Sequence, residues 1–125
     1  MVKAAKRTIL VVDDDPEIVL LLRTRLEKRG YRTLVATDGH QAIDTAKRER
    51  PDAILLDVMM PGKSGWEVAR ALKQDPVTAA IKIVIVSAIG PAVTDATSSL
   101  YGADAHLDKP FEFAKLDQVV DGLFA

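Results

Sequence analysis

The stretch TILVVDDDPEIVLLL, residues 8–22, contains the signals that decide the fold class. Thr8–Val12 is a short, mostly apolar run without alternation, which is typical of a strand covered on both faces. Asp13–Asp15 end this run, and Pro16 is a favourable first residue for a helix. Apolar residues then recur at helical spacing, at Ile18, Leu21, Leu22 and Leu26. The stretch therefore predicts a buried strand, a polar turn and an amphipathic helix over Pro16–Arg29, with Gly30 as its C-terminal cap.

The same pattern recurs four more times along the chain. Further apolar runs predict strands at Thr33–Ala36, Ala53–Leu56, Ile81–Val86 and Ala105–Leu107. Helices are predicted from Gly39 to about Arg48 behind an Asp38 cap, from the Ser64–Glu67 capping box to about Gln74, and over about Ala92–Tyr101. The last helix has an apolar stripe of Leu116, Val119, Val120 and Leu123, with Asp117, Gln118 and Asp121 on the opposite face. Alternating strands and helices predict one α/β domain over residues 1–125, with a parallel sheet.

The composition excludes several classes of protein. The 125 residues include no Cys, and the net charge is −1. The absence of Cys excludes a disulfide scaffold, a Cys zinc finger and a thiol enzyme. The small charge gives no general attraction to nucleic acid or anionic lipid. The longest apolar run, Ile18–Leu22, is far shorter than the about 20 residues that a membrane helix needs. We therefore expect a soluble, cytoplasmic domain that binds neither nucleic acid directly nor membranes.

Polar side chains follow the predicted strands at one edge of the sheet. Asp13 and Asp14 follow the first strand and Asp57 the third, while Ser87 and Lys109 end the last two. Ligands of open α/β sheets bind beyond the carboxyl ends of the strands, so we expect one composite site. Three neighbouring carboxylates repel one another unless a cation compensates them, and hard oxygen ligands with several waters suit Mg²⁺. We also predict a cis Lys109–Pro110 peptide that directs the lysine toward the strand ends.

Four motifs at these strand ends resemble those of the response regulator receiver domain of two-component systems. They are ILVVDDDPE, LLDVMMPGKSGWE, VIVSA and YGADAHLDKPF, in the family's order, within about Thr8 to Phe124. The resemblance implies a flavodoxin-like (βα)5 three-layer sandwich with strand order 2-1-3-4-5. It also implies a signalling phosphoacceptor rather than an enzyme, with a cognate histidine kinase or phosphotransfer protein as phosphodonor.

The resemblance also implies a role for each residue of the site. Asp57 is the phosphoacceptor, which attacks the phosphohistidine of a sensor kinase. Lys109 pairs with the phosphoryl oxygens, and Ser87 hydrogen-bonds one of them. Mg²⁺ is held by Asp13, Asp14, Asp57 and the backbone carbonyl of Met59. These roles agree with the needs of phosphoryl transfer, which depends mostly on positioning and on neutralising charge. Asp15 is expected to cap the first helix rather than bind the metal.

In the family, phosphorylation switches the surface formed by the fourth helix, the fifth strand and the fifth helix, which signals to a partner or output domain. An aromatic residue on the fifth strand usually takes part, and this chain has His106 in its place. Lys115 is the only basic residue after Lys109, so the charge-paired dimer of many DNA-binding regulators is not expected. We expect a monomer or a weak dimer.

Three residues are expected to control access to the phosphoryl group. Met59 and Ile89 lie two positions after Asp57 and Ser87, where the family borders the path of the hydrolytic water. Both are bulky and apolar, which predicts slow loss of the phosphoryl group. Ala88 is small and leaves room for a phosphodonor.

Three other interpretations of the sequence differ from this one. A flavodoxin-like electron carrier needs a phosphate-binding loop rich in Ser, Thr and Gly after the first strand, whereas Asp13–Asp15 would repel a phosphate. A haloacid-dehalogenase-like phosphatase needs Asp-x-Asp-x-Thr there, and this chain has Glu17 at the Thr position. A receiver that acts only as a scaffold stays open as a third alternative.

Overall fold

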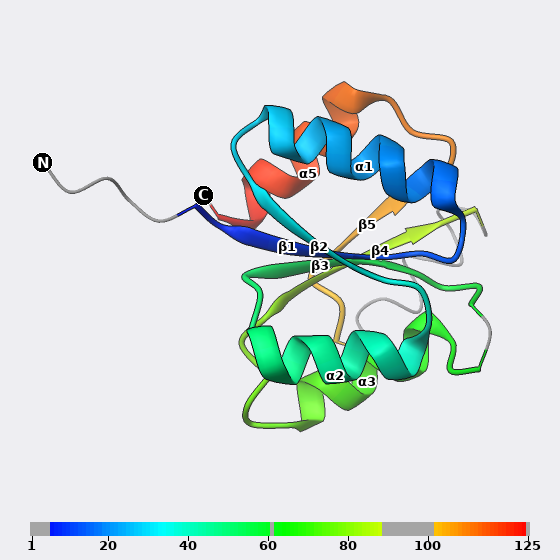
Figure 1. Cartoon of the computed structure of the whole chain (residues 1–125), viewed down its shortest axis with the longest axis vertical. Helices are drawn as coiled ribbons and strands as arrows, with labels where there is room; N and C mark the ends of the chain where they lie inside the picture. The colour runs from blue at the N-terminus through cyan, green and yellow to red at the C-terminus, as the bar shows by residue number, and fades with distance from the viewer. Residues whose placement is uncertain (1–5, 61, 89–101, 125) are drawn as a thin grey trace, which may run out of the picture.

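The computed structural model describes residues 6–60, 62–88 and 102–124. Labels follow Figure 1, and the elements are β1 (Thr8–Val12), α1 (Pro16–Lys28), β2 (Arg32–Ala36), α2 (Gly39–Glu49), β3 (Ala53–Asp57), α3 (Gly65–Gln74), β4 (Lys82–Ser87), β5 (Ala105–Asp108) and α5 (Phe113–Leu123). Each end of a described element lies within one residue of the predicted position wherever the sequence predicted one. The helix predicted over Ala92–Tyr101 lies outside the described residues.

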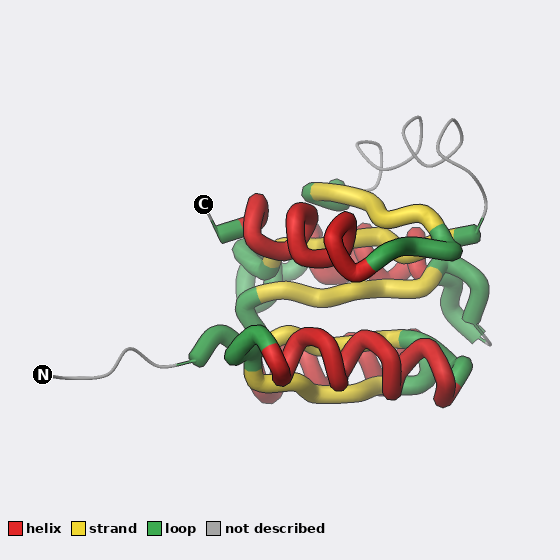
Figure 2. The backbone as a smooth tube through the Cα atoms, turned by 90° about the horizontal axis from the view of Figure 1, so that it is seen from above, coloured by secondary structure: helices red, strands yellow, loops and turns green. Residues whose placement is uncertain are grey.

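The five strands form one parallel sheet in the order β2-β1-β3-β4-β5. This order confirms the flavodoxin-like topology that the resemblance implied. Figures 1 and 2 show three layers, with α1 and α5 on one face of the sheet and α2 and α3 on the other. The carboxyl ends of β1, β3, β4 and β5 meet at one edge, where the turns carry the polar residues.

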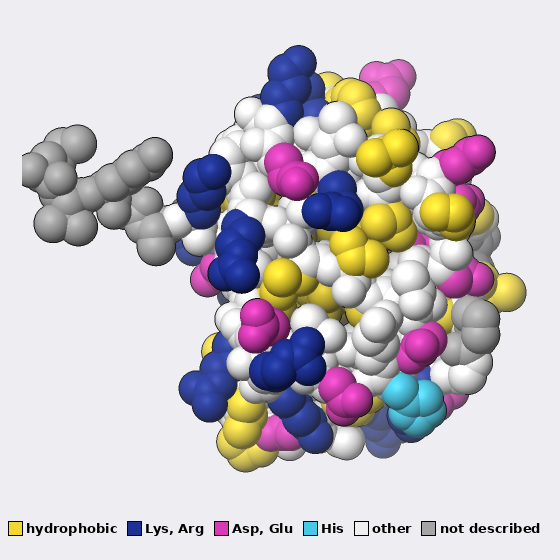
Figure 3. Space-filling view, in the orientation of Figure 1, with side chains coloured by type: hydrophobic (Ala, Val, Ile, Leu, Met, Phe, Trp, Pro, Cys, Tyr) yellow, Lys and Arg dark blue, Asp and Glu magenta, His cyan; other side chains and the backbone are white. Residues whose placement is uncertain are grey.

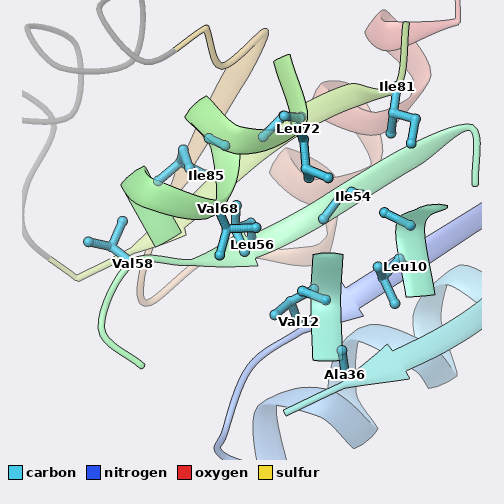
Figure 4. Close-up of a cluster of buried hydrophobic side chains, with 14 residues drawn as sticks. Leu10, Val12, Ala36, Ile54, Leu56, Val58, Val68, Leu72, Ile81 and Ile85 are labelled. Atoms are coloured by element: carbon cyan, nitrogen blue, oxygen red, sulfur yellow. The ribbon is translucent and has the colours of Figure 1, made fainter. Parts of the chain in front are cut away.

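Two hydrophobic cores lie on the two faces of the sheet because successive strand residues point in opposite directions. Leu10 and Val12 of β1 belong to the core beneath α2 and α3, whereas Ile9 and Val11 belong to the core beneath α1 and α5. In Figure 4, side chains of α3 such as Leu72 lie against those of β3 and β4. The strands are thus fixed from both sides, which makes their carboxyl ends a rigid support.

The predicted helix caps are present. The side chains of Asp15, Asp38 and Ser64 accept hydrogen bonds from Glu17 N, Gln41 N and Glu67 N, at 2.9, 2.8 and 3.3 Å. Gly30 follows α1 with a φ of +94°, a left-handed conformation that glycine adopts without strain. Because caps are local chemistry, the sequence was sufficient to predict them.

Two predictions about helix faces are wrong. Leu22 and Leu26 are buried, but Leu21 is 40% exposed. Asp117 does not lie on a solvated face of α5, because α5 packs beside α1 and brings it to two cations. Its carboxylate lies 2.6 Å from Arg25 Nη2 and 3.3 Å from Arg29 Nε. The hydrogen bond from Arg25 lowers the pKa of Asp117, so this pair joins the two helices through charge.

Within the described ranges, no helix is long and apolar enough to cross a lipid bilayer.

Gly65, the first residue of α3, packs directly on the backbone at the end of β3. Its N–H donates a hydrogen bond to Val58 O at 2.9 Å. A Cβ atom at this position would lie 2.2 Å from Asp57 O and 2.8 Å from Val58 Cα. Backbone atoms cannot move aside as a flexible side chain can, so only glycine fits between α3 and Asp57.

We predict that Gly65→Ala lowers the free energy of unfolding by about 1–3 kcal/mol, the usual cost of overpacking. Urea unfolding of the two proteins measures the difference. Gly122→Ala in α5 is the matched control, because a Cβ atom there meets nothing within 4 Å. This control should be neutral or stabilising by up to about 1 kcal/mol, since alanine favours helix. Equal effects of the two substitutions would contradict the proposed close packing.

Candidate functional site

The acidic site lies at the carboxyl ends of β1 and β3. Asp13 and Asp14 follow β1, and Asp57 is the last residue of β3. Asp13 and Asp57 are only 2% and 6% exposed, whereas Asp14 is exposed to solvent. One carboxylate oxygen from each lies within 4.8 Å of the others. The parallel sheet therefore brings together the three acids that the sequence predicted to converge.

Lys109, just after β5, neutralises part of this charge. Its Nζ lies 2.9 Å from Asp13 Oδ2, with which it forms a hydrogen bond, and 3.6 Å from Asp57 Oδ1. The cation thus lies between the two buried carboxylates. The repulsion expected from the sequence is therefore offset within the chain itself. The Lys109–Pro110 peptide is cis, as predicted.

Backbone N–H groups hold both buried acids in place. Asp15 N donates to Asp13 Oδ1 at 2.9 Å, and Met59 N donates to Asp57 Oδ1 at 3.4 Å. Asp13 consequently has two hydrogen-bond donors, one on each carboxylate oxygen. It is a structural anchor of the turn as well as an acid of the site, which the sequence pattern did not indicate.

The electrostatic environment perturbs the pKa values of two groups. Burial, followed by the negative charge of Asp13, raises the pKa of Asp57 above its ordinary value, and Lys109 only partly opposes this. Burial by itself would lower the pKa of Lys109, but the hydrogen bond to Asp13 and the charge of Asp57 outweigh it and raise the pKa. The Asp57 carboxylate is thus costly to keep ionised, whereas the Lys109 amine next to it stays positively charged.

The donor set fits a small, hard divalent cation. Carboxylate oxygens are the ligands that Mg²⁺ prefers, and the exposed side of Asp14 leaves room for the waters that Mg²⁺ usually retains. Two buried acids with one lysine leave excess negative charge, which a divalent ion would remove. The three acids form the only such group of at least three potential ligand side chains within the described residues.

The remaining predicted residues surround this cluster. Ser87 ends β4 and is buried, and its carbonyl accepts a hydrogen bond from Lys109 N at 2.8 Å. Met59 is 72% exposed, and Ala88 is also exposed. His106 is half-buried on β5, next to Ile85 in the register with β4. Ile89 lies outside the described residues.

Gly65 is a residue of the site that sequence reasoning missed. It has no chemistry of its own, but its close approach sets where α3 begins relative to Asp57. The available signal was a glycine directly after the Ser64 cap, at a helix position where glycine is unfavourable. Such a residue indicates a close backbone contact rather than a helix preference.

Known proteins resemble this chain in sequence along almost its whole length. The sequence profile of the response regulator receiver domain matches residues 9–121. Protein PilH of Pseudomonas aeruginosa is 33% identical over 117 residues, which cover 94% of this chain and 97% of PilH. Several transcriptional regulators also match, and the chain spans 43%, 37% and 46% of the length of three of them.

Solved structures show the same architecture. A putative response regulator from Chloroflexus aurantiacus has a TM-score of 0.91 and 30% identity, and covers 95% of this chain and 98% of that one. The receiver domain of sensor histidine kinase PA1611 from P. aeruginosa, with a magnesium ion coordinated in its active site cleft, has a TM-score of 0.87 and 28% identity. That match covers 97% of this chain and all of the other. With the profile match, the sheet order and the acidic cluster in agreement, this chain belongs to the response regulator receiver domain family, the phosphoacceptor domains of two-component systems.

Proposed function

We propose that Asp57 is the residue that accepts the phosphoryl group, from the phosphohistidine of a cognate histidine kinase or phosphotransfer protein. The observation that carries this proposal is the position of Asp57, which is buried beside Asp13 and within 3.6 Å of Lys109. Lys109, next to Asp57, and Ser87, at the end of the neighbouring strand β4, are the side chains that would bind the phosphoryl oxygens. The protein thus acts as a signalling phosphoacceptor and not as an enzyme with a separate substrate.

The transfer exchanges one bond to phosphorus for another. A carboxylate oxygen of Asp57 forms a bond to phosphorus while the phosphorus–nitrogen bond of the donor imidazole breaks, and the imidazole keeps the electron pair. Asp57 is ionised for this step, and its raised pKa makes the carboxylate a more basic nucleophile. Lys109 stabilises the negative charge on the transferred group.

Asp13, Asp14, Asp57 and the backbone carbonyl of Met59 are the groups that would hold Mg²⁺. Mg²⁺ held there would supply positive charge to neutralise the acids and the transferred phosphoryl group. In the chain itself, Asp13 is fixed by Asp15 N and Lys109, so it needs no rearrangement to serve as a ligand. Asp14 is exposed and can bind through water.

The signal is proposed to leave through β5 and α5, together with the segment that precedes β5. An acyl phosphate adds negative charge and acceptor oxygens beside Ser87 and Lys109. A shift of Ser87 toward them would be transmitted across β4 to His106, which faces Ile85 in the register. A partner protein or an output domain would bind this surface.

Incubation with a small phosphodonor and Mg²⁺ should add one phosphoryl group, measured by intact mass. Asp57→Asn should abolish the gain, because an amide oxygen is a poor nucleophile. Asp15→Asn is the matched control, since asparagine is an equally good helix cap and the Asp15 backbone donor is kept. A phosphoryl group that persists on Asp57→Asn would reject this residue as acceptor.

The stability of the metal-free protein should depend on Asp57 and on pH. Because the folded state raises the Asp57 pKa, ionisation costs stability above that pKa and costs nothing below the ordinary value of 3.8. Asp57→Asn should therefore raise the free energy of unfolding at neutral pH, in the presence of a chelator. Its advantage should shrink as the pH falls toward 3.8.

Urea unfolding at several pH values measures this difference. Asp44→Asn, on the exposed face of α2, controls for the loss of a negative charge alone. An advantage of Asp57→Asn that is independent of pH would contradict the prediction.

Loss of the phosphoryl group should be slow because Met59 and Ile89 are apolar residues at the two positions where the family borders the path of the hydrolytic water. Met59 is exposed there and cannot orient a water by hydrogen bonding. The double variant Met59→Asn with Ile89→Glu should hydrolyse about tenfold faster, which corresponds to roughly 1.4 kcal/mol of barrier. The decay of the phosphorylated protein, followed by intact mass, measures the rate. Met59→Leu is the control and should decay like the natural protein, whereas unchanged decay of the double variant would reject shielding.

A further inference from the structure

β2 forms one edge of the sheet, and its outer backbone groups point away from the rest of the domain. Arg32 N donates to Arg7 O at 2.9 Å, and Ala36 O accepts from Asp13 N at 3.2 Å, so both residues face β1. The direction of the backbone N–H and C=O groups alternates from residue to residue along a strand. The backbone groups of Leu34 therefore also point toward β1, and those of Thr33 and Val35 point outward. In the ranges that the structure describes, no strand pairs with this outer side.

The open segment is short and is bordered by apolar surface. The next outward N–H, that of Thr37, is already bound to Gln41 Oε1 at 2.7 Å, so the opening spans Thr33 to Val35. A groove of about 480 Å³ lies on the α1 side and one of about 490 Å³ on the α2 side, and Val35 lines both. Leu20 of α1, 67% exposed, borders the first groove. An added strand would therefore find both hydrogen-bond partners and space for its side chains.

Opposite charges lie at the two ends of this edge. Arg32 is the first residue of β2 and Arg48 lies in the last turn of α2, whereas Asp38 follows the end of β2 and Asp44 lies midway along α2. Among the residues with described positions, the side chains of Arg32 and Asp44 have no ion-pair partner. In Figure 3, hydrophobic side chains cross the middle of this face, Lys and Arg are more frequent to the left and below with some Asp and Glu among them, and the right-hand part carries mainly Asp and Glu.

We propose that the β2 edge binds a second copy of this chain, which pairs antiparallel to the first through Thr33 and Val35. A two-fold axis at Leu34 would place Thr33 opposite Val35 of the partner subunit, and Val35 opposite Thr33 of the partner subunit. Each of these pairs exchanges two backbone hydrogen bonds, so four form across the axis. The two Leu34 side chains, on the α2 side, meet at the axis.

The charge pattern selects a second copy in this orientation. Antiparallel pairing brings Arg32, at the beginning of one β2 strand, toward Asp38 and Asp44 of the partner subunit, which lie beyond the end of β2 and midway along α2. Parallel pairing would place like charges together, which is unfavourable. Only two residues of each edge are open, so the contact is small and the dimer should be weak and concentration-dependent. This inference is independent of phosphorylation at Asp57.

Sedimentation equilibrium from micromolar to millimolar protein, without metal or phosphodonor, tests the proposal. Arg32→Glu and Asp44→Lys should each raise the dimer dissociation constant roughly tenfold, because each replaces two symmetry-related attractions by repulsions. The double variant should restore dimerisation, since it exchanges the charges. Lys115→Glu, at the start of α5 beside the opposite edge of the sheet, makes the same charge change as Arg32→Glu and should have no effect.

Amide hydrogen exchange gives a direct readout of the backbone pairing. Exchange of the Thr33 and Val35 amides should slow as the protein concentration rises, while the Leu34 amide, which already faces β1, should not change. A protein that stays monomeric over the whole range, with unprotected Thr33 and Val35 amides, would overturn the proposal. So would a dimer that Lys115→Glu weakens as much as Arg32→Glu does, since that places the interface elsewhere. Protection that appears only when an extended peptide is added would assign the edge to a different occupant.

Discussion

The contact between Lys109 and the two buried carboxylates is the interaction on which the site depends. Asp13 and Asp57 are almost completely removed from water, where two neighbouring negative charges are costly. Lys109 lies 2.9 Å from one and 3.6 Å from the other and makes this arrangement tolerable. It does not cancel the charge, because Asp14 is also present and the pKa of Asp57 remains raised. The remaining negative charge is what a divalent cation would neutralise, so that an anionic phosphoryl group could approach Asp57.

The rest of the fold supports this contact. The three residues come from β1, β3 and β5, and β3 and β5 are separated by β4 in the sheet. A core on each face fixes the strands, so their carboxyl ends keep a constant separation. Gly65 lets α3 begin against the backbone of Asp57, and the Arg25–Asp117 pair joins α1 to α5. Rigid support of this kind is what a reaction that depends on positioning requires.

The charges of the molecule are unevenly distributed. This distribution suits the proposed binding of a cation and a phosphoryl group at one end of the sheet and the proposed contact between two copies at the β2 edge. The acids collect at the carboxyl ends of the strands, where a cation and a phosphoryl group are proposed to bind. Several basic residues lie toward the opposite end, among them Arg32 and Lys82 at the beginnings of β2 and β4. A net charge of only −1 hides this polarity. The same polarity is what would favour the proposed antiparallel association at the β2 edge, and the small opening at Thr33 and Val35 would keep it weak.

The sequence alone determined the strands, the caps, the α/β class and the three acids, because these follow from local patterns. Continuous apolar runs predict strands buried on both faces, and Asp15, Asp38 and Ser64 cap the helices that follow them. The sheet order and the site residues came from motifs that resemble a family. Only the tertiary structure showed that Lys109 hydrogen-bonds Asp13, that Asp117 pairs with Arg25, that Leu21 is exposed and that Gly65 touches Asp57. These features depend on how helices and strands that are far apart in sequence pack together. A local sequence pattern carries no information about which distant residues come into contact.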